Sequence, residues 1–326
     1  MTPRRRRLLA AGLAAALLAP LAALSQAGDY PGKPIRIIVS FSAGGTTDVV
    51  ARRIGQRLTA HLKQPVVIEN KPGAGGTLGT DYTARSPADG YTLLMTSSGP
   101  VAISPSLSKK LATNPLTDIV PVICVVDVPN VLVVYPDLPV KTVQEFQAYA
   151  RANPGKLNFG STGVGTVAHL AGVMFTERAG IEATHVPYKG ADAVTDVMTG
   201  RTQFMFATLP SVITSIRAGK LRPLAAVTDR RSTTLPEVPT MTQAGIPGME
   251  TGAWFGLFAP KGTPPAVIQK LNATVNEILK EKAVMETFET LGADPTGGSP
   301  QDFARKIAAD YEAWKAIVLR SGVTVD

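Results

Sequence analysis

The sequence has very little of the side chains that most catalytic and metal sites require. Its 326 residues include one cysteine, Cys124, and three histidines, His61, His169 and His185. A single cysteine cannot form an internal disulfide, and no CxxC or HxxxH spacing is present to hold zinc. Neither a GxxxxGK[ST] phosphate loop nor a GxSxG nucleophile elbow occurs. We therefore expect no cofactor and no metal site.

The sequence is also poor in charge, with 18% charged residues against 44% hydrophobic ones. This balance allows a sizeable core and argues against a disordered chain or a coiled coil. The formal net charge of +8 would ordinarily suggest a nucleic acid or an anionic surface as partner. No aromatic residues are interleaved with the basic ones, so we expect no nucleic-acid binding.

Half of the excess charge lies in a segment that resembles a secretory leader. Arginines at positions 4–7 precede an apolar run from Leu8 to Leu24, which ends in Ser25-Gln26-Ala27. The run is short and broken by Pro20, which disfavours a transmembrane anchor. We predict a signal peptide over residues 1–27 and a periplasmic location. Its removal leaves 299 residues and lowers the charge to +4, because four arginines and no acids are lost.

The remaining chain alternates β-branched runs with helical periodicity. A strand ending at Phe41 is followed by Val50, Ile54, Leu58 and Leu62, spaced four apart as on one helix face. Alternation of this kind predicts an α/β protein whose sheets are doubly wound, mostly parallel and flanked by helices. The length suggests two domains, with crossings expected near positions 127 and 229. Further strands are predicted at 66–69, 91–95 and 131–134.

Three hydroxyl residues are predicted to begin helices. Thr142 stands three residues before Glu145, the spacing of a capping box. Thr263 and Ser299 each precede a proline, which is favoured at the first position of a helix.

Glycine-rich turns between strand and helix are the most informative feature. They occupy residues 41–48, 159–166 and 188–192. Glycine lets the backbone approach a ligand, and the free amides at a helix start attract anions. One such turn is weak evidence, but three, two of them rich in hydroxyls, favour a small anion held by amides and hydroxyls.

Four features of the sequence allow an alternative role. Ser161 followed by His169 would suit a nucleophile and base in an exported α/β hydrolase, although a histidine there more often packs against its turn. Asp48 and Asp196 could form an acid–base pair, but bracing a helix start is the simpler role. Trp254 is interpreted as a core aromatic, with hinge packing as the alternative, and Cys124 as an inert buried thiol. A third class of function is a structural or adhesion module, which would bind no small ligand.

The sequence resembles the periplasmic receptors of the tripartite tricarboxylate transporter family, the Bug-type solute-binding proteins. The resemblance covers nearly the whole chain after residue 27. It rests on blocks that match in order: residues 30–39, 44–48, 67–76, 88–93, 163–170, 186–190, 219–225, 254–260 and 262–264.

The resemblance implies a two-domain Venus flytrap of the type II periplasmic-binding-protein kind. We expect residues 28–127 and 229–326 to form domain 1 and residues 128–228 to form domain 2. It implies no enzyme activity, a small organic acid or amide as ligand, a monomer, and a membrane permease or a sensor as partner. The turns that hold a ligand carboxylate in the family correspond to Phe41, Ser42, Ala43, Gly44, Gly45, Thr46, Thr47, Asp48, Ser161, Thr162, Gly163, Val164, Gly165, Thr166, Tyr188, Gly190, Ala191 and Asp192. The family positions Ser97, Ser98, Gly99 and Thr208 are expected to face the same cleft, and His169 is also predicted to bind the ligand.

Two departures from the family pattern affect the expected ligand. The turn between Tyr188 and Asp196 is shorter than usual and brings in Asp192, which could repel a second carboxylate or bind an amine. Val173 replaces a glutamate common in the family. Dicarboxylates, amino acids, aromatic acids and amides therefore all remain open as ligands.

Overall fold

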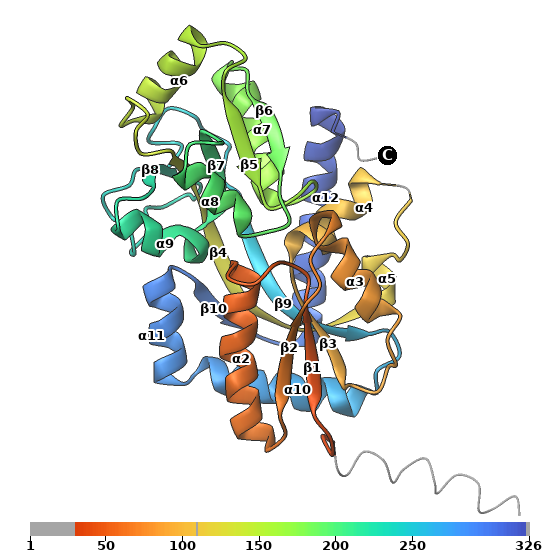
Figure 1. Ribbon diagram of the computed structural model, residues 1–326. Helices are drawn as coiled ribbons and strands as arrows, with labels where there is room; N and C mark the ends of the chain where they lie inside the picture. The colour runs from red at the N-terminus through yellow and green to blue at the C-terminus, as the bar shows by residue number, and fades with distance from the viewer. Residues whose placement is uncertain (1–29, 109, 324–326) are drawn as a thin grey trace, which may run out of the picture.

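The structure is a computed structural model that describes residues 30–108 and 110–323. The predicted signal peptide lies outside these residues. Strands and helices alternate along the chain, so the predicted α/β class is confirmed. The elements form two lobes, seen as the lower and upper halves of Figure 1. No helix within the described ranges is long and apolar enough to cross a bilayer.

Lobe 1, the lower half of Figure 1, contains both the N-terminal elements and the C-terminal ones. Its N-terminal elements are β1 (Ile35–Val39), α2 (Thr46–Leu62), β2 (Val66–Asn70), a 3-10 turn (Ala74–Gly76), α3 (Thr77–Ala84), β3 (Thr92–Ser97), a π-helical turn (Gly99–Ile103), α4 (Ser104–Leu107) and α5 (Pro115–Asp118). Its C-terminal elements are β9 (Gly252–Pro260), α10 (Pro265–Leu279), α11 (Lys282–Leu291), β10 (Asp294–Gly297) and α12 (Pro300–Ser321).

Lobe 2 is built from the middle of the chain. It contains α6 (Val143–Ala152), β5 (Asn158–Ser161), α7 (Val167–Ala179), β6 (Thr184–Pro187), α8 (Asp192–Met198), β7 (Phe204–Thr208), α9 (Leu209–Arg217) and β8 (Arg222–Ala226). Strand β4 (Ile119–Val134) belongs to both lobes, because it pairs with β9 over its first part and with β7 and β8 over its last. The predicted strand at 131–134 is therefore only the end of a 16-residue strand.

The sheet is continuous through the two lobes, in the order β2-β1-β3-β9-β4-β7-β5-β6. Strands β1, β2 and β3 are parallel, as are β5, β6 and β7, which follows the prediction. The antiparallel pairs all involve β4 or β9, the two strands in the middle of this order. Each lobe thus offers the carboxyl ends of parallel strands, where α/β proteins form their binding crevices.

The predicted helix faces are present in the structure. Val50, Ile54 and Leu58 of α2 are almost fully buried, which fixes this helix against the sheet and sets the place where its first turn begins. Ser299 caps α12 in a capping box with Asp302. The predicted cap at Thr263 is wrong: its hydroxyl donates to the carbonyl of Pro260, and the helix begins at Pro265 instead.

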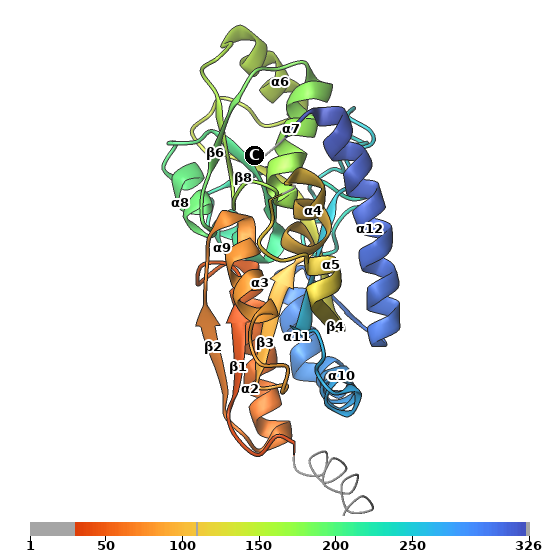
Figure 2. The same ribbon diagram turned by 90° about the vertical axis from the view of Figure 1, so that its right-hand side faces the viewer.

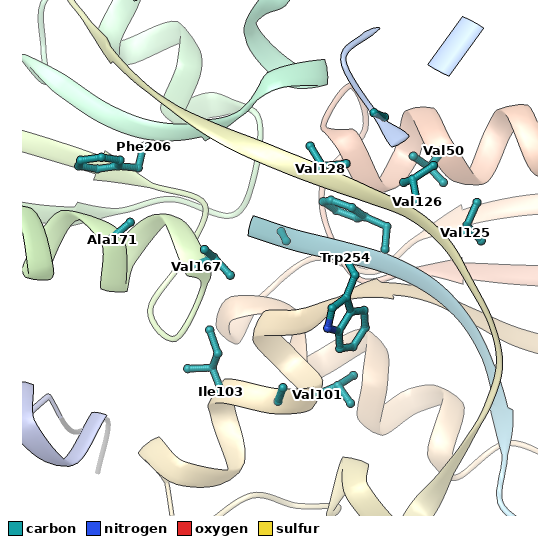
Figure 3. Close-up of a cluster of buried hydrophobic side chains, with 14 of the residues drawn as sticks. Val50, Val101, Ile103, Val125, Val126, Val128, Val167, Ala171, Phe206 and Trp254 are labelled. Carbon is teal, nitrogen blue, oxygen red and sulfur yellow. The ribbon is translucent and has the colours of Figure 1, made fainter. Parts of the chain in front are cut away.

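The hydrophobic core runs from one lobe into the other. Figure 3 shows Val50 at one end of the cluster, Phe206 at the other, and Trp254 between them. Trp254 is buried, meets Phe303 edge-on and donates from Nε1 to Asp310 at 2.6 Å. It therefore combines core packing with a position on a strand at the junction of the lobes.

Contacts of residues 235–249 bear on the second crossing between lobes. Met241 donates its amide to Ala226, and the side chains of Gln144 and Arg178 donate to carbonyls in this segment. These contacts favour a crossing closer to Gly252 than to the predicted position 229. We propose that the first crossing lies within β4 and the second near Gly252.

Candidate functional site

A cavity of about 60 Å³ lies between the two lobes. Its wall combines the first βα turn of lobe 1 with the helix starts of lobe 2 and with strands β4, β7 and β9. The lining residues are Phe41, Gly45, Thr46, Thr47, Ser97, Asn130, Thr162, Thr166, Val167, Ala168, Gly190, Ala191, Val194, Met205, Phe206, Ala207, Thr208, Ser211, Ala253 and Phe255.

Three helices of more than two turns begin at this cavity. Gly45 is the N-cap of α2, Thr166 of α7 and Thr208 of α9, and all three residues are in the wall. The first amides of a helix have no partner within it, and the helix dipole makes this end electropositive. Helices from both lobes thus direct their anion-binding ends toward one space.

The wall contains hydroxyls but no ionisable side chain among the described residues. The hydroxyls of Thr47, Ser97 and Thr162 have no hydrogen-bond partner in the described part of the chain, although Thr47 and Ser97 are buried. An anion here would be neutralised by backbone and hydroxyl dipoles rather than by a counter-charge.

Asp48 stands close to the cavity but is occupied elsewhere. Its carboxylate accepts from the amide of Gly44 at 3.0 Å, from Arg52 at 2.9 Å and from Asn70 at 3.0 Å. Burial raises the pKa of Asp48, but these hydrogen bonds and the charge of Arg52 outweigh burial and hold that pKa below its usual value. Asp48 therefore braces the turn that carries the start of α2.

Side chains of the two lobes bond directly across the cavity. Thr46 and Thr208, at the starts of α2 and α9, share a hydrogen bond of 2.7 Å between their hydroxyls. The hydroxyl of Ser42 accepts from the amide of Ala191 at 3.0 Å, and the amide of Ser42 donates to Lys189. The lobes are thus in contact at the mouth of the site.

Glycines allow this contact. A Cβ on Gly75 of lobe 1 would lie 2.1 Å from the carbonyl oxygen of Val164 in lobe 2, and Gly75 has φ +62°. A Cβ on Gly190 would lie 2.2 Å from Oγ of Ser42. Both distances are shorter than real contacts. The neighbour of Gly75 is backbone and that of Gly190 is a side-chain hydroxyl, and both glycines have a positive φ, so both positions favour glycine.

The serine of the proposed hydrolase alternative is paired with a different histidine. Oγ of Ser161 lies 2.7 Å from Nε2 of His185 and also bonds the backbone of Gly163. His169 stacks on His185 with ring centroids 4.0 Å apart, and its Nδ1 accepts from the amide of Gly165. Burial lowers the pKa of His169 to about 4, and burial together with His169 lowers that of His185 to about 3. Through these hydrogen bonds the cluster of Ser161, His169 and His185 stabilises the turn between β5 and α7.

The structure brings ten of the predicted ligand-binding residues into the wall: Phe41, Gly45, Thr46, Thr47, Ser97, Thr162, Thr166, Gly190, Ala191 and Thr208. Four others, Gly163, Val164, Gly165 and Tyr188, line a neighbouring groove between the lobes. The remaining predicted residues are outside both surfaces: Ser42, Ala43, Gly44, Asp48, Ser98, Gly99, Ser161, His169 and Asp192. Asp192 is exposed on α8. Ligand binding by all 23 residues stays a prediction.

Sequence reasoning missed ten wall residues. Eight are apolar side chains of β7, β9 and the helix starts, which carry no signal of their own: Val167, Ala168, Val194, Met205, Phe206, Ala207, Ala253 and Phe255. Ser211 of α9 is the ninth. Asn130 is the tenth, and the sequence gives a signal for it, because Asn130 and Asp127 are the two polar side chains in the apolar run 119–134. Among the described residues no three His, Cys, Asp or Glu side chains are grouped to hold a metal.

Known proteins resemble the chain over almost its whole length. The family model for the tripartite tricarboxylate transporter family receptor, TctC, matches residues 50–323. BugT of Bordetella pertussis is 42% identical over 306 residues, which cover 93% of this chain and 94% of BugT.

Solved structures match the fold as well. A protein of Rhodopseudomonas palustris with adipate is 37% identical, with a TM-score of 0.88 over 91% of this chain and 99% of that one. The periplasmic binding protein BugD is 34% identical, with a TM-score of 0.87 over 90% and 99%. MatC from R. palustris with bound malate is 32% identical, with a TM-score of 0.85 over 89% and 100%.

These matches confirm the predicted family and the periplasmic-binding-protein fold. The family consists of solute-binding receptors and not of enzymes, which removes the hydrolase alternative for Ser161 and His169. Because the family model matches residues 50–323 and BugT is 42% identical over 93% of this chain, the chain belongs to the tripartite tricarboxylate transporter family receptors.

Proposed function

We propose that this receptor captures a small organic acid in the cavity between its lobes, in the periplasm, and presents it to a membrane permease or a sensor protein. The carboxylate lies at the converging starts of α2, α7 and α9, where backbone amides and the hydroxyls of Thr47, Ser97 and Thr162 donate to it. The convergence of three helix starts from both lobes on one cavity carries this proposal.

Dicarboxylates are the first class to test. Relatives with 32–37% identity are described with adipate and with malate. The wall supports an acid without help from a cation, because dipoles from both lobes face the same space. A leader-like N-terminus and periplasmic relatives support the location.

The mechanism follows from contacts between the lobes. A ligand that is bound only to the start of α2, in lobe 1, makes no hydrogen bonds to the first amides of α7 and α9. When the lobes close, these amides of lobe 2 come within reach of the ligand. Closure is favoured by interactions made only in the closed state, such as the Thr46–Thr208 bond. The closed form is the one a permease or sensor would distinguish from the empty receptor.

Calorimetric titration with a panel of dicarboxylates and monocarboxylates tests this function. We expect at least one acid to bind, and Thr47→Val to weaken it about tenfold, because a hydrogen bond to a charged group contributes about 1.5–3 kcal/mol. Thr274→Val is the matched control, since that hydroxyl bonds the carbonyl of Lys270 on an exposed helix face. Absence of binding across the panel, or equal losses in both variants, would contradict the proposal.

A further inference from the structure

The side-chain amide of Asn130, which is buried in the cavity wall, has a hydrogen-bond acceptor without a partner in the described part of the chain. Asn130 lies in β4 where this strand passes from lobe 1 to lobe 2, and only 1% of Asn130 is exposed. Its Nδ2 donates to the carbonyl of Thr251 at 3.2 Å. Its Oδ1 has no hydrogen-bond partner among the described residues.

The orientation of this amide is set by its neighbour. The carbonyl of Thr251 can only accept, so the NH2 group of Asn130 must face it, and a flipped amide would place two oxygens together. Oδ1 is therefore the free atom. An unsatisfied buried acceptor costs about 1–3 kcal/mol, and such groups in native proteins usually have a partner that is a ligand or a water.

Asn130 is placed among the groups that we assign to the ligand. It is the direct partner of Thr208 in the antiparallel pair of β4 and β7, and side chains at such paired positions lie on the same face of a sheet. Thr208 begins α9 and bonds Thr46 across the cavity. Asn130 thus belongs to the same wall as the helix starts, and its free oxygen accepts where they donate.

A positively charged group is a poor partner for this oxygen. No acidic side chain is in the described wall to balance an ammonium group, and three helix starts would repel it. Asp48 is paired with Arg52, and Asp192 is exposed outside the cavity. The acceptor therefore suits a neutral donor.

We infer that the ligand is an acid that also carries a neutral hydrogen-bond donor, a hydroxyl or an amide N–H, which Oδ1 of Asn130 accepts. This inference rests on the proposed function and narrows it: hydroxy acids and amide acids are preferred over plain acids and over amino acids. Asn130 then couples the ligand to both crossings between the lobes, because its amide nitrogen holds the segment at Thr251.

Matched ligands test the inference in the unmodified mature protein. Calorimetric titration compares succinate, malate (both enantiomers) and aspartate, and the same three substituents on a three-carbon skeleton: propionate, lactate and alanine. On a skeleton that binds, we expect the hydroxy acid to bind about tenfold tighter than the plain acid, from one additional net hydrogen bond. We expect the amino acid to bind more weakly than the plain acid.

Variants assign the preference to Asn130. In Asn130→Leu the hydroxy acid and the plain acid should bind with about equal affinity. In Thr47→Val the affinities for both acids should fall, and the ratio between them should stay as in the unmodified protein. The ratio within one variant does not depend on how stable that variant is, and the comparison in the unmodified protein stands even where Asn130→Leu does not fold.

Three results are distinguished. A plain acid that binds as tightly as its hydroxy acid overturns the inference and leaves the proposed function intact. A ratio that survives Asn130→Leu also overturns it, and assigns a water to Oδ1. No binding of any acid contradicts the proposed function itself.

Discussion

At the scale of single residues, the lobes meet through glycines that have no room for a side chain. Gly75 faces the carbonyl of Val164, which is backbone and cannot move aside as a flexible side chain would. Its φ of +62° adds a second requirement for glycine. We expect Gly75 to matter for the proposed closure of the lobes more than for the folding of either lobe.

Gly75→Ala should therefore weaken ligand binding about tenfold or more. Each loss of about 1.4 kcal/mol in the free energy of closure raises the dissociation constant by a factor of about ten. Calorimetric titration gives the affinity, and small-angle scattering with ligand should show a larger radius of gyration than for the unmodified receptor.

Gly155→Ala is the matched control for this change. Gly155 has φ +70° but nothing within 4 Å of an added Cβ, so it carries the same backbone strain without the contact between lobes. Equal affinity losses in both variants would show that strain, and not closure, is responsible.

The glycine turns could be found from the sequence, because the turns at 41–48, 159–166 and 188–192 stand out as glycine-rich links between strand and helix. Their contact with one another could not, since it depends on how the lobes meet. Asn130 was missed for a related reason: whether a lone amide in a β-strand is satisfied depends on neighbours more than a hundred residues away, such as Thr251.

At the scale of elements, the turn between β5 and α7 depends on two neutral histidines. His169 and His185 are stacked, and Ser161 and Gly165 bond their ring nitrogens. The functional role suggested by sequence, Ser161 with His169, paired the wrong side chains, because β6 brings His185 beside β5 in the parallel pair Phe159–His185.

The stability of the protein should fall as the pH drops from about 6.5 toward 4. The unfolded chain protonates His169 near its ordinary pKa of 6.5, whereas the folded chain does not until about pH 4, so the unfolded state binds more protons in this window. The full effect for His169 is on the order of 3 kcal/mol.

Thermal melting between pH 7 and pH 4.5 measures this loss. His169→Asn keeps an acceptor for the amide of Gly165 and should melt with a shallower pH dependence than the unmodified protein. A slope unaltered in His169→Asn would contradict the assignment.

At the scale of the whole molecule, a continuous sheet and a shared hydrophobic cluster join the lobes. Strand β4 pairs within both, and the hydrophobic cluster that contains Val50 also contains Phe206. Helix α12 extends along lobe 1 and reaches α7 of lobe 2, as Figure 2 shows. We expect the two lobes to unfold together rather than one after the other.

Leu132→Ala should destabilise both lobes by the same amount, about 2–5 kcal/mol, since Leu132 is fully buried in the shared strand. Hydrogen exchange in urea reports each lobe separately, through the amides of β1 and β5. Leu319→Ala, at a 74% exposed residue, should have little effect. Loss of protection in β5 well before β1 would show that the lobes unfold independently.

The alternation of strands and helices, with the apolar face of α2, was enough to predict the α/β class. The 16-residue length of β4 was not predictable, because Asp127 and Pro129 interrupt its apolar pattern and read as a strand end. The second crossing, predicted at 229 and proposed here near Gly252, is hard to place from sequence, because residues 235–249 form no helix or strand and their contacts with lobe 2 are long-range, such as that of Gln144 with Ala244.

The absence of ionisable side chains from the described wall of the cavity determines how ligand binding depends on pH and buffer. Because no group in the described wall gains or loses a proton near neutral pH, binding of an ionised acid should release no buffer protons, and its measured heat should be the same in buffers of different ionisation enthalpy. The receptor would then collect its solute equally well as periplasmic acidity varies, down to the range where the solute's own carboxyl groups titrate.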